Sequence, residues 1–288
     1  MKARWIEGAE LAEIWEKLPY SEAPFDTWEW WERLPMKWSA ICIEESGAPI
    51  CLIPFAVRRL GLIRLYRQPL SVPWIPFRLA APLPETRAAK YSWLRRLLSS
   101  LVEWTRQEHL VYIAGALGPE WCYLPALTSF RVKGHGSFVL RVGEFSPSKE
   151  LLRKVRQVEK VPLQTLLPEE AYEWWLAHRP PGVSTKLAAQ LRPLLSLYEA
   201  WHIVGLGTPL QAVAFFLKGR NRVWYMTSAH AEGAGQSVTR LLYEAILLAH
   251  SQGKDFDFQG STLPGVERFF RQFGGEWEVR YFISAWRF

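Results

Sequence analysis

The sequence contains few cysteines and no long apolar run. Cysteine occurs only at Cys42, Cys51 and Cys122 among 288 residues, and no two of these form a Cys-x-x-Cys pair. This odd and widely spaced set predicts buried thiols in a reducing compartment rather than a disulfide framework or a zinc site. No segment approaches the roughly 18 uninterrupted apolar residues that a membrane-spanning helix requires. The charged amino terminus has no apolar signal-peptide core, so we expect a soluble, cytoplasmic protein without a membrane span.

Several common enzyme signatures are also missing. The six histidines are scattered without metal-site spacing, so we expect no metal. The P-loop pattern G-x-x-x-x-G-K-[ST] does not occur, and no Ser-His-Asp arrangement can be recognised. The one glycine-rich loop lacks the third glycine of the dinucleotide-binding fingerprint. These absences leave other kinds of phosphate or acyl chemistry open.

Tryptophan and positive charge are abundant instead. The chain contains 16 Trp and has a formal net charge of +7. Clustered tryptophans most often form core, with groove walls and interfaces as alternatives. The basic balance favours an anionic partner, which can be nucleic acid, a phosphorylated cofactor or an anionic membrane surface. Charge alone does not choose among these three.

The order of predicted elements is similar in the two halves of the chain. In the first half, a hairpin over 38–57 is followed by a helix over 85–108 and a strand over 110–115. The second half gives a hairpin, a long helix and a strand at 209–229, 237–252 and 254–258. This mixture predicts an α+β protein and gives a hint of duplication, because the elements recur although the residues do not.

We place a domain boundary in the middle of the chain. A strand pair is predicted over 128–142, turning at Gly134-His135-Gly136, and Ser146-Pro147 is a typical helix start. A basic helix, LLRKVRQVEK, then follows. The expected domains are residues 1–145 and 146–288.

The most prominent loop of the second half is Ala231-Glu232-Gly233-Ala234-Gly235-Gln236-Ser237, between a strand and an amphipathic helix. Its two glycines allow a sharp turn and close approach of a ligand. The first amides of the following helix have no partners within the helix and lie at the positive end of its dipole. The loop therefore suits the pyrophosphate of an acyl carrier such as coenzyme A, and a plain strand-to-helix turn is the alternative.

The carboxyl-terminal sequence contains a motif that is more specific than the glycine loop. It reads Asp255-Phe256-Asp257-Phe258-Gln259-Gly260-Ser261, followed by Gly265-Val266-Glu267-Arg268-Phe269-Phe270-Arg271-Gln272-Phe273-Gly274-Gly275. A strand ending in DF-x-G-S, then G-[VL]-x-x-F-x-x-x-F-G, resembles the end of the FemABX-like acyltransferases and related GNAT-fold acetyltransferases. The resemblance is strongest over residues 200–288 and rests on element order over residues 1–145.

This resemblance implies tandem GNAT-like domains, each with a mixed, mainly antiparallel sheet flanked by helices. It also implies an acyl-CoA donor such as acetyl-CoA, and a small-molecule or peptide amine as acceptor in a cleft between the domains. The sequence departs from the family patterns at two places. His230-Ala231-Glu232 occupies the place where many GNAT enzymes have Arg or Gln, and Phe269-Phe270 replaces the Phe-Lys of peptidyltransferase members. The missing lysine argues against aminoacyl-tRNA as donor.

Candidate site residues follow from the motifs, and each has a structural alternative. As catalytic groups we expect Asp257, His230 and Tyr225, with Asp257 or His230 as base; Asp257 can equally anchor a turn. For the acyl carrier we expect Gly233, Ala234, Gly235, Gln236, Ser237 and Arg271. For the substrate we expect Trp224, Ser261 and Glu267.

Three functions remain open at this point. The first is N-acyl transfer from acyl-CoA to an amine. The second is peptidyl transfer from aminoacyl-tRNA, with the basic helix after Ser148 contacting RNA phosphates. The third is a non-catalytic GNAT-like binding protein. The oligomeric state, acyl length and acceptor are not readable from the sequence.

Overall fold

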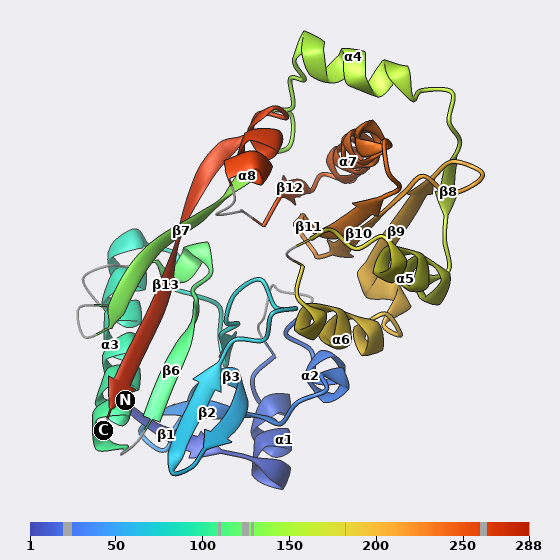
Figure 1. Ribbon diagram of the computed structural model, residues 1–288. Coiled ribbons are helices and arrows are strands. Elements are labelled where there is room, and N and C mark those ends of the chain that lie inside the picture. Colours follow the sequence, from blue (N-terminus) through green and yellow to red (C-terminus); the bar gives the residue numbers. More distant parts are fainter. Residues whose placement is uncertain are drawn as a thin grey trace. The chain divides into compact units, whose positions relative to one another are not determined.

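The computed structural model describes residues 1–19, 25–108, 111–122, 127, 130–181, 183–259 and 264–287. The chain divides into two compact units. Unit 1 comprises residues 1–135 and 279–288, and unit 2 comprises residues 136–278 (Figure 1). This division differs from a single boundary after residue 145, because residues 136–145 belong to unit 2 and the last ten residues return to unit 1.

Unit 1 is built on a mixed, mainly antiparallel sheet. Its strands lie in the order β1 (Lys2–Ile6), β2 (Trp38–Glu45), β3 (Ala48–Leu60), β4 (Ile63–Arg67), β6 (Val111–Ala116) and the end of β13 (Glu276–Arg287). Only β4 and β6 pair in parallel. The two-residue β5 (Arg78–Leu79) pairs with β3. The helices of this unit are α1 (Gly8–Glu16), α2 (Trp28–Arg33) and α3 (Arg87–Gln107), with a short 3₁₀ helix at Pro119–Trp121.

Unit 2 repeats this plan. Its strands lie in the order β7 (Arg131–Leu140), β12 (Asp255–Asp257), β11 (Arg222–His230), β10 (Ala212–Lys218), β9 (Trp201–Leu206) and β8 (Leu163–Thr165). Again a single pair, β11 with β12, is parallel. The helices are α4 (Lys149–Gln157), α5 (Pro168–Ala177), α6 (Thr185–Leu194), α7 (Gly235–Ser251) and α8 (Pro264–Arg271), with a 3₁₀ helix at Tyr198–Ala200. The α+β prediction is confirmed.

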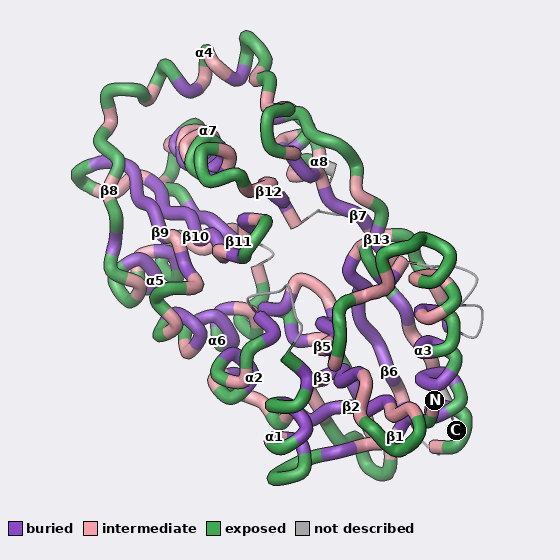
Figure 2. Tube along the Cα trace, turned by 180° about the vertical axis from the view of Figure 1, so that it is seen from behind, coloured by how far each residue is buried: buried purple, intermediate pink, exposed green. Residues whose placement is uncertain are grey.

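Helix α7 covers one face of the unit 2 sheet, because its apolar stripe is continuous. The stripe residues are buried, and they are Val238, Leu241, Leu242, Ala245, Ile246 and Ala249. They pack with Ala214 and Phe216 of β10 and with Phe256 of β12. Figure 2 shows β9, β10 and β11 largely buried beneath the helices. Full burial of a side chain such as Leu contributes about 1.5–3 kcal/mol, so this face anchors the start of α7 firmly.

The strand pair predicted around Gly134-His135-Gly136 is wrong. The structure has one continuous strand, β7, through both glycines, and neither glycine has a positive φ. A Cβ atom at Gly136 would lie 2.5 Å from the ring of Trp277. Glycine therefore serves close packing of an aromatic ring at this position and does not mark a turn. The following helix also begins later than Ser146-Pro147, with Ser148 as its cap accepting from the N–H of Leu151 at 3.1 Å.

The expected burial of the thiols is confirmed for two of them. Cys42 and Cys51 are buried in unit 1, Cys122 is partly exposed, and none of the three forms a disulfide within the described part of the chain. Burial raises the pKa of Cys42 to about 12. Among the described residues, no helix is long and apolar enough to cross a bilayer.

The turn between α8 and β13 gives a direct test of this packing. Gly274 and Gly275 both have positive φ, +86° and +95°, but only at Gly275 would a Cβ atom approach backbone, 2.8 Å from the carbonyl oxygen of Val139. Gly274→Ala should cost about 1–2 kcal/mol for the left-handed conformation alone. Gly275→Ala should cost more than about 3 kcal/mol, since the backbone clash adds to the same term. Urea unfolding of both variants measures the difference, and equal losses would contradict the described turn.

Candidate functional site

Strands β11 and β12 run parallel for only three residues. Arg222–Trp224 pairs with Asp255–Asp257, and β11 then continues to His230 beside β10 alone among the described strands. We call Tyr225–His230 the open edge of β11. The N–H of Ala231 donates to the carbonyl of Gln211 at 2.8 Å, so alternation along an antiparallel pair directs the backbone groups of Ser228 and His230 away from β10. The open edge thus presents backbone donors and acceptors for a further extended partner.

A β-bulge marks the place where the two strands part. Phe215 pairs with Thr227 and Phe216 pairs with Tyr225, which leaves Met226 as an extra residue on β11. A bulge bends its strand and increases the local twist. This local bend accounts for the departure of β11 from β12 directly after Trp224.

The loop after β11 leads into α7 without a side-chain cap. The N–H of Ala234 donates to Ala231 at 3.0 Å, and that of Ser237 donates to Ala234 at 2.9 Å. In the contacts of the described residues, the N–H groups of Gly235 and Gln236 have no acceptor. A Cβ atom at Gly233 would have nothing within 4 Å, so the space before the helix is open. These free amides at a helix start form a seat for an anion.

Among the residues predicted to hold the carrier, Ser237 has a different place. It is buried, and its hydroxyl donates to Oε1 of Gln211 at 3.3 Å. This bond ties the first turn of α7 to the segment before β10. Ser237 therefore fixes the loop, whereas Gly233, Ala234, Gly235 and Gln236 form its exposed turn.

His230 stands beside this seat. Its ring lies 4.0 Å from the position of a Cβ atom at Gly235. Nδ1 is 2.9 Å from the carbonyl oxygen of Ala231. Because a carbonyl only accepts, Nδ1 carries the hydrogen in the neutral ring, and Nε2 is left with a free lone pair. The exposed side chain therefore presents Nε2 as a proton acceptor.

Tyr225 supplies a proton donor on the same side of the strand. Its hydroxyl is 2.7 Å from that of Ser228, and its ring packs edge-on against Phe270 of α8. Burial raises the pKa of Tyr225 to about 12, although the Ser228 hydrogen bond works in the opposite direction. The phenol consequently keeps its proton throughout the ordinary pH range.

Asp257 is held in a buried ionic network and is fully enclosed. Oδ1 accepts from the hydroxyl of Ser137 at 2.6 Å and from the N–H of Gln259 at 2.8 Å, while Oδ2 accepts from Arg222 at 3.1 Å. Arg222 also pairs with Glu278 at 2.8 Å. These contacts favour the anchoring role for Asp257, because its oxygens are committed to donors of three different strands and turns.

The remaining predicted residues lie elsewhere. Trp224 pairs with Leu217 and covers Gly219, so it belongs to the hairpin turn and not to the open edge. Glu267 and Arg271 form a 3.7 Å ion pair with each other on α8, and no described contact joins them to the glycine loop. Ser261 lies outside the described residues. The sequence did not single out Ser228, whose role depends on a bulge that has no distinct sequence signal.

In unit 1, where the parallel strands β4 and β6 correspond to β11 and β12, the residues after β4 hydrogen-bond to the backbone of β6. After β4 ends, the N–H of Gln68 donates to Ala114 at 3.1 Å, and its side-chain oxygen accepts from the N–H of Ala116 at 2.6 Å. The side-chain amide of Gln68 also donates to Val72. The N–H of Ile75 donates to the carbonyl of Ala116 at 2.8 Å. The chain itself therefore takes the backbone groups that remain open in unit 2.

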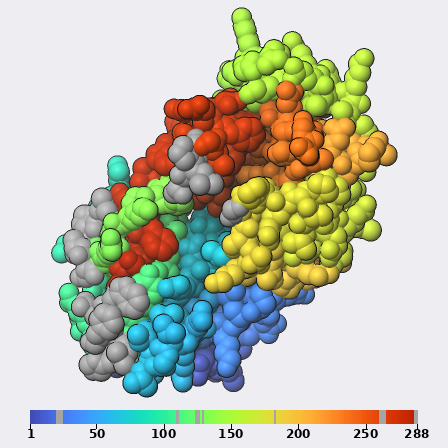
Figure 3. Space-filling model, viewed as in Figure 1, coloured from blue at the N-terminus to red at the C-terminus, as the bar shows by residue number. Residues whose placement is uncertain are grey.

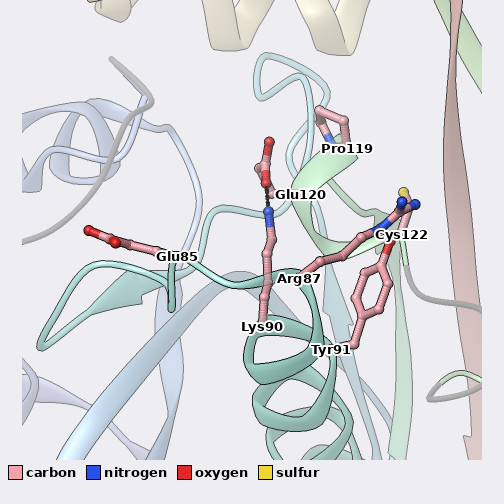
Figure 4. Close-up of a pocket in the computed structure, with 7 residues that line it drawn as sticks. All are labelled: Glu85, Arg87, Lys90, Tyr91, Pro119, Glu120 and Cys122. Atoms are coloured by element: carbon pink, nitrogen blue, oxygen red, sulfur yellow. Dashed lines mark hydrogen bonds and ion pairs between the residues drawn. The ribbon is translucent and has the colours of Figure 1, made fainter.

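The helix start of unit 1 is likewise occupied. A cavity of about 310 Å³ lies at the start of α3, and Figure 4 shows the side chains that line it. There Lys90 pairs with Glu120, and Arg87 donates to the hydroxyl of Tyr91 at 3.0 Å. Thr86 caps the helix by accepting from the N–H of Ala89 at 3.4 Å. With Lys90 paired, Arg87 bonded to a hydroxyl and the helix capped, this cavity offers no seat comparable to that before α7.

No protein-family model and no curated protein sequence matches the chain. Solved structures match over nearly its whole length. FemX is 10% identical with a TM-score of 0.61, covering 98% of this chain and 97% of its own. A tandem GNAT protein from the clavulanic acid biosynthesis pathway is 12% identical with a TM-score of 0.54, covering 99% and 98%. A GNAT-family acetyltransferase from Colwellia psychrerythraea is 12% identical with a TM-score of 0.53, covering 100% of both chains. The chain therefore has a tandem GNAT-like fold.

The anchoring role of Asp257 can be separated from catalysis. Asp257→Asn removes the charge facing Arg222 in a buried network, which should cost about 3–5 kcal/mol of unfolding free energy. Glu150→Gln removes an exposed partner of Arg153 and should leave the unfolding free energy nearly unchanged, because solvent screens the pair. Urea unfolding measures both. A stable Asp257→Asn protein that has lost acyl transfer would instead identify Asp257 as a catalytic residue.

Proposed function

We propose that unit 2 binds an acyl-CoA, for example acetyl-CoA, and transfers its acyl group to an amine. The observation that carries this proposal is the open edge of β11 ending directly at the uncapped start of α7. An extended arm with amide groups can hydrogen-bond to the backbone of the open edge. Phosphates attached to that arm would then lie at the free N–H groups of Gly235 and Gln236. An acyl carrier such as coenzyme A has both parts, an arm with amide groups and phosphates attached to that arm.

The side chains beside this path supply proton transfer. In the proposed reaction the amine attacks the thioester carbon, the C–N bond forms and the C–S bond breaks. Nε2 of His230 takes the proton that the amine loses, and the Tyr225 hydroxyl gives a proton to the leaving thiolate. Backbone N–H groups of the open edge stabilise the oxyanion. Asp257 acts as an anchor here, and Arg271, Glu267 and Trp224 have no assigned part.

Aminoacyl-tRNA is the alternative donor, and the surface of α4 is the observation in its favour. Arg153, Arg156 and Lys160 are exposed, and the helix lies at the rim of unit 2 in Figure 3. Arg153 is however paired with Glu150 at 2.8 Å, and Lys154 donates to Gln272 at 2.8 Å. These contacts reduce the charge available for phosphates. Binding of tRNA that weakens steeply with salt would support this donor.

The donor site is tested by thermal unfolding with acetyl-CoA. A ligand at one hundred times its dissociation constant stabilises by about 2.7 kcal/mol, which is a visible shift. Gly235→Glu should abolish the shift, because it places a carboxylate beside the His230 ring at the anion seat. Gly134→Glu makes the same change at an open position of unit 1 and should keep it. No shift with acetyl-CoA, free CoA or a longer acyl-CoA would refute the proposed donor.

The role of His230 is tested by the kinetics of His230→Gln. This variant should lower kcat about 10²–10⁴-fold, because the attacking amine then has no proton acceptor. Acetyl-CoA binding to this variant should persist. Because burial raises the pKa of Tyr225 to about 12, Tyr225 should cause no decline of kcat/KM in the native protein until the pH approaches 12. An unchanged kcat in His230→Gln would show that another group is the base.

A further inference from the structure

The tip of the β3–β4 hairpin in unit 1 is apolar and projects into solvent. β3 ends at Leu60 and β4 begins at Ile63, which pair across the turn at Gly61 and Leu62. Leu60 is 58% exposed and Leu62 is 84% exposed, the largest value for a large apolar side chain among the described residues. Single exposed leucines are common on protein surfaces. Two exposed leucines at the same turn form a small apolar tip that is not part of the core.

Arginines surround this apolar tip. The ten residues Arg58–Arg67 contain four arginines and no acidic residue. Arg58 and Arg59 are exposed and, within the described part of the chain, have no carboxylate at ion-pair distance. Being successive residues of a strand, they point to opposite faces of the ribbon. Arg64 lies opposite Arg59, contacts Glu108 at 3.7 Å and interacts with the Tyr66 side chain.

We propose that this hairpin tip docks on an anionic lipid surface. Leu60 and Leu62 would enter the boundary between headgroups and acyl chains, and Arg58 and Arg59 would bind lipid phosphates from the two faces of the ribbon. The long arginine side chains reach outward while their stems stay along apolar surface. A nucleic acid would satisfy the same charges but would leave both leucines in water. The combination of charge and apolar tip therefore fits a bilayer better than RNA.

This inference is independent of acyl transfer. The tip belongs to unit 1, and the open edge of β11 belongs to unit 2. A variant of the tip should leave acetyl-CoA binding unchanged, whereas Gly235→Glu should leave lipid binding unchanged. The two proposals can therefore fail separately.

Co-sedimentation of the full chain with vesicles tests the proposal. Vesicles that contain phosphatidylglycerol should bind the protein, and pure phosphatidylcholine vesicles should bind it far less. Leu62→Asp should lower the partition coefficient about tenfold or more. The double variant Arg58→Glu, Arg59→Glu should lower it at least about 25-fold, since each arginine near an anionic surface is worth about fivefold. Added salt should weaken binding.

Leu167→Asp is the matched control. Leu167 is 73% exposed in unit 2, and the nearby Glu169 and Glu170 make it unsuited to an anionic surface. This variant should bind vesicles as the native protein does. The proposal is overturned if anionic vesicles do not bind the protein, or if Leu62→Asp and Leu167→Asp bind equally well. It is also overturned if tRNA binds the tip arginines with no dependence on Leu62. Because Leu62 is exposed, the thermal stability of its variant should be unchanged, which checks the fold.

Discussion

The short parallel pairing of β11 with β12 is the constraint on which the proposed site depends. Three residue pairs join the strands, and the network of Asp257, Arg222 and Glu278 holds that end of the pair in place. The bulge at Met226 then turns β11 away. Because one end is fixed and the other is released, the backbone groups of Ser228 and His230 that face away from β10 have no partner strand among the described residues, although Ser228 itself is buried. A longer β12 pairing would remove both the open edge and the path to α7.

The two units share one strand order but differ in how the backbone groups beside their parallel strands are hydrogen-bonded. In unit 1 the side chain of Gln68 and the main chain of Ile75 hydrogen-bond to backbone groups of Ala116 that would otherwise be left open where β4 and β6 part. A Cβ atom at Gly115 would lie 2.4 Å from the Ile75 side chain, so this filling is tight. An unpaired backbone group costs free energy unless water or a ligand satisfies it. Unit 1 meets this cost with its own residues, and unit 2 leaves the groups for water or a ligand.

Much of the fold could be predicted from the sequence, for clear physical reasons. The apolar periodicity of α3 and α7 and the hairpin pattern over 38–57 are local signals, and the structure has these elements near the predicted positions. Gly136 misled the prediction because its packing against Trp277 is a non-local cause. The hydrogen-bond donors to Asp257 come from residues 137, 222 and 259, so its anchoring role required the tertiary structure. Ser228 and the sealing Gln68 were missed for the same reason.

Backbone hydrogen exchange with and without acetyl-CoA tests the central claim most directly. The account predicts that saturating acetyl-CoA slows exchange at the amides of Ser228, His230, Gly235 and Gln236. It also predicts no change at Ala116, whose amide is already bonded to Gln68. Protection that appears in unit 1 around Ala116, or no protection along the open edge of β11, would contradict the account.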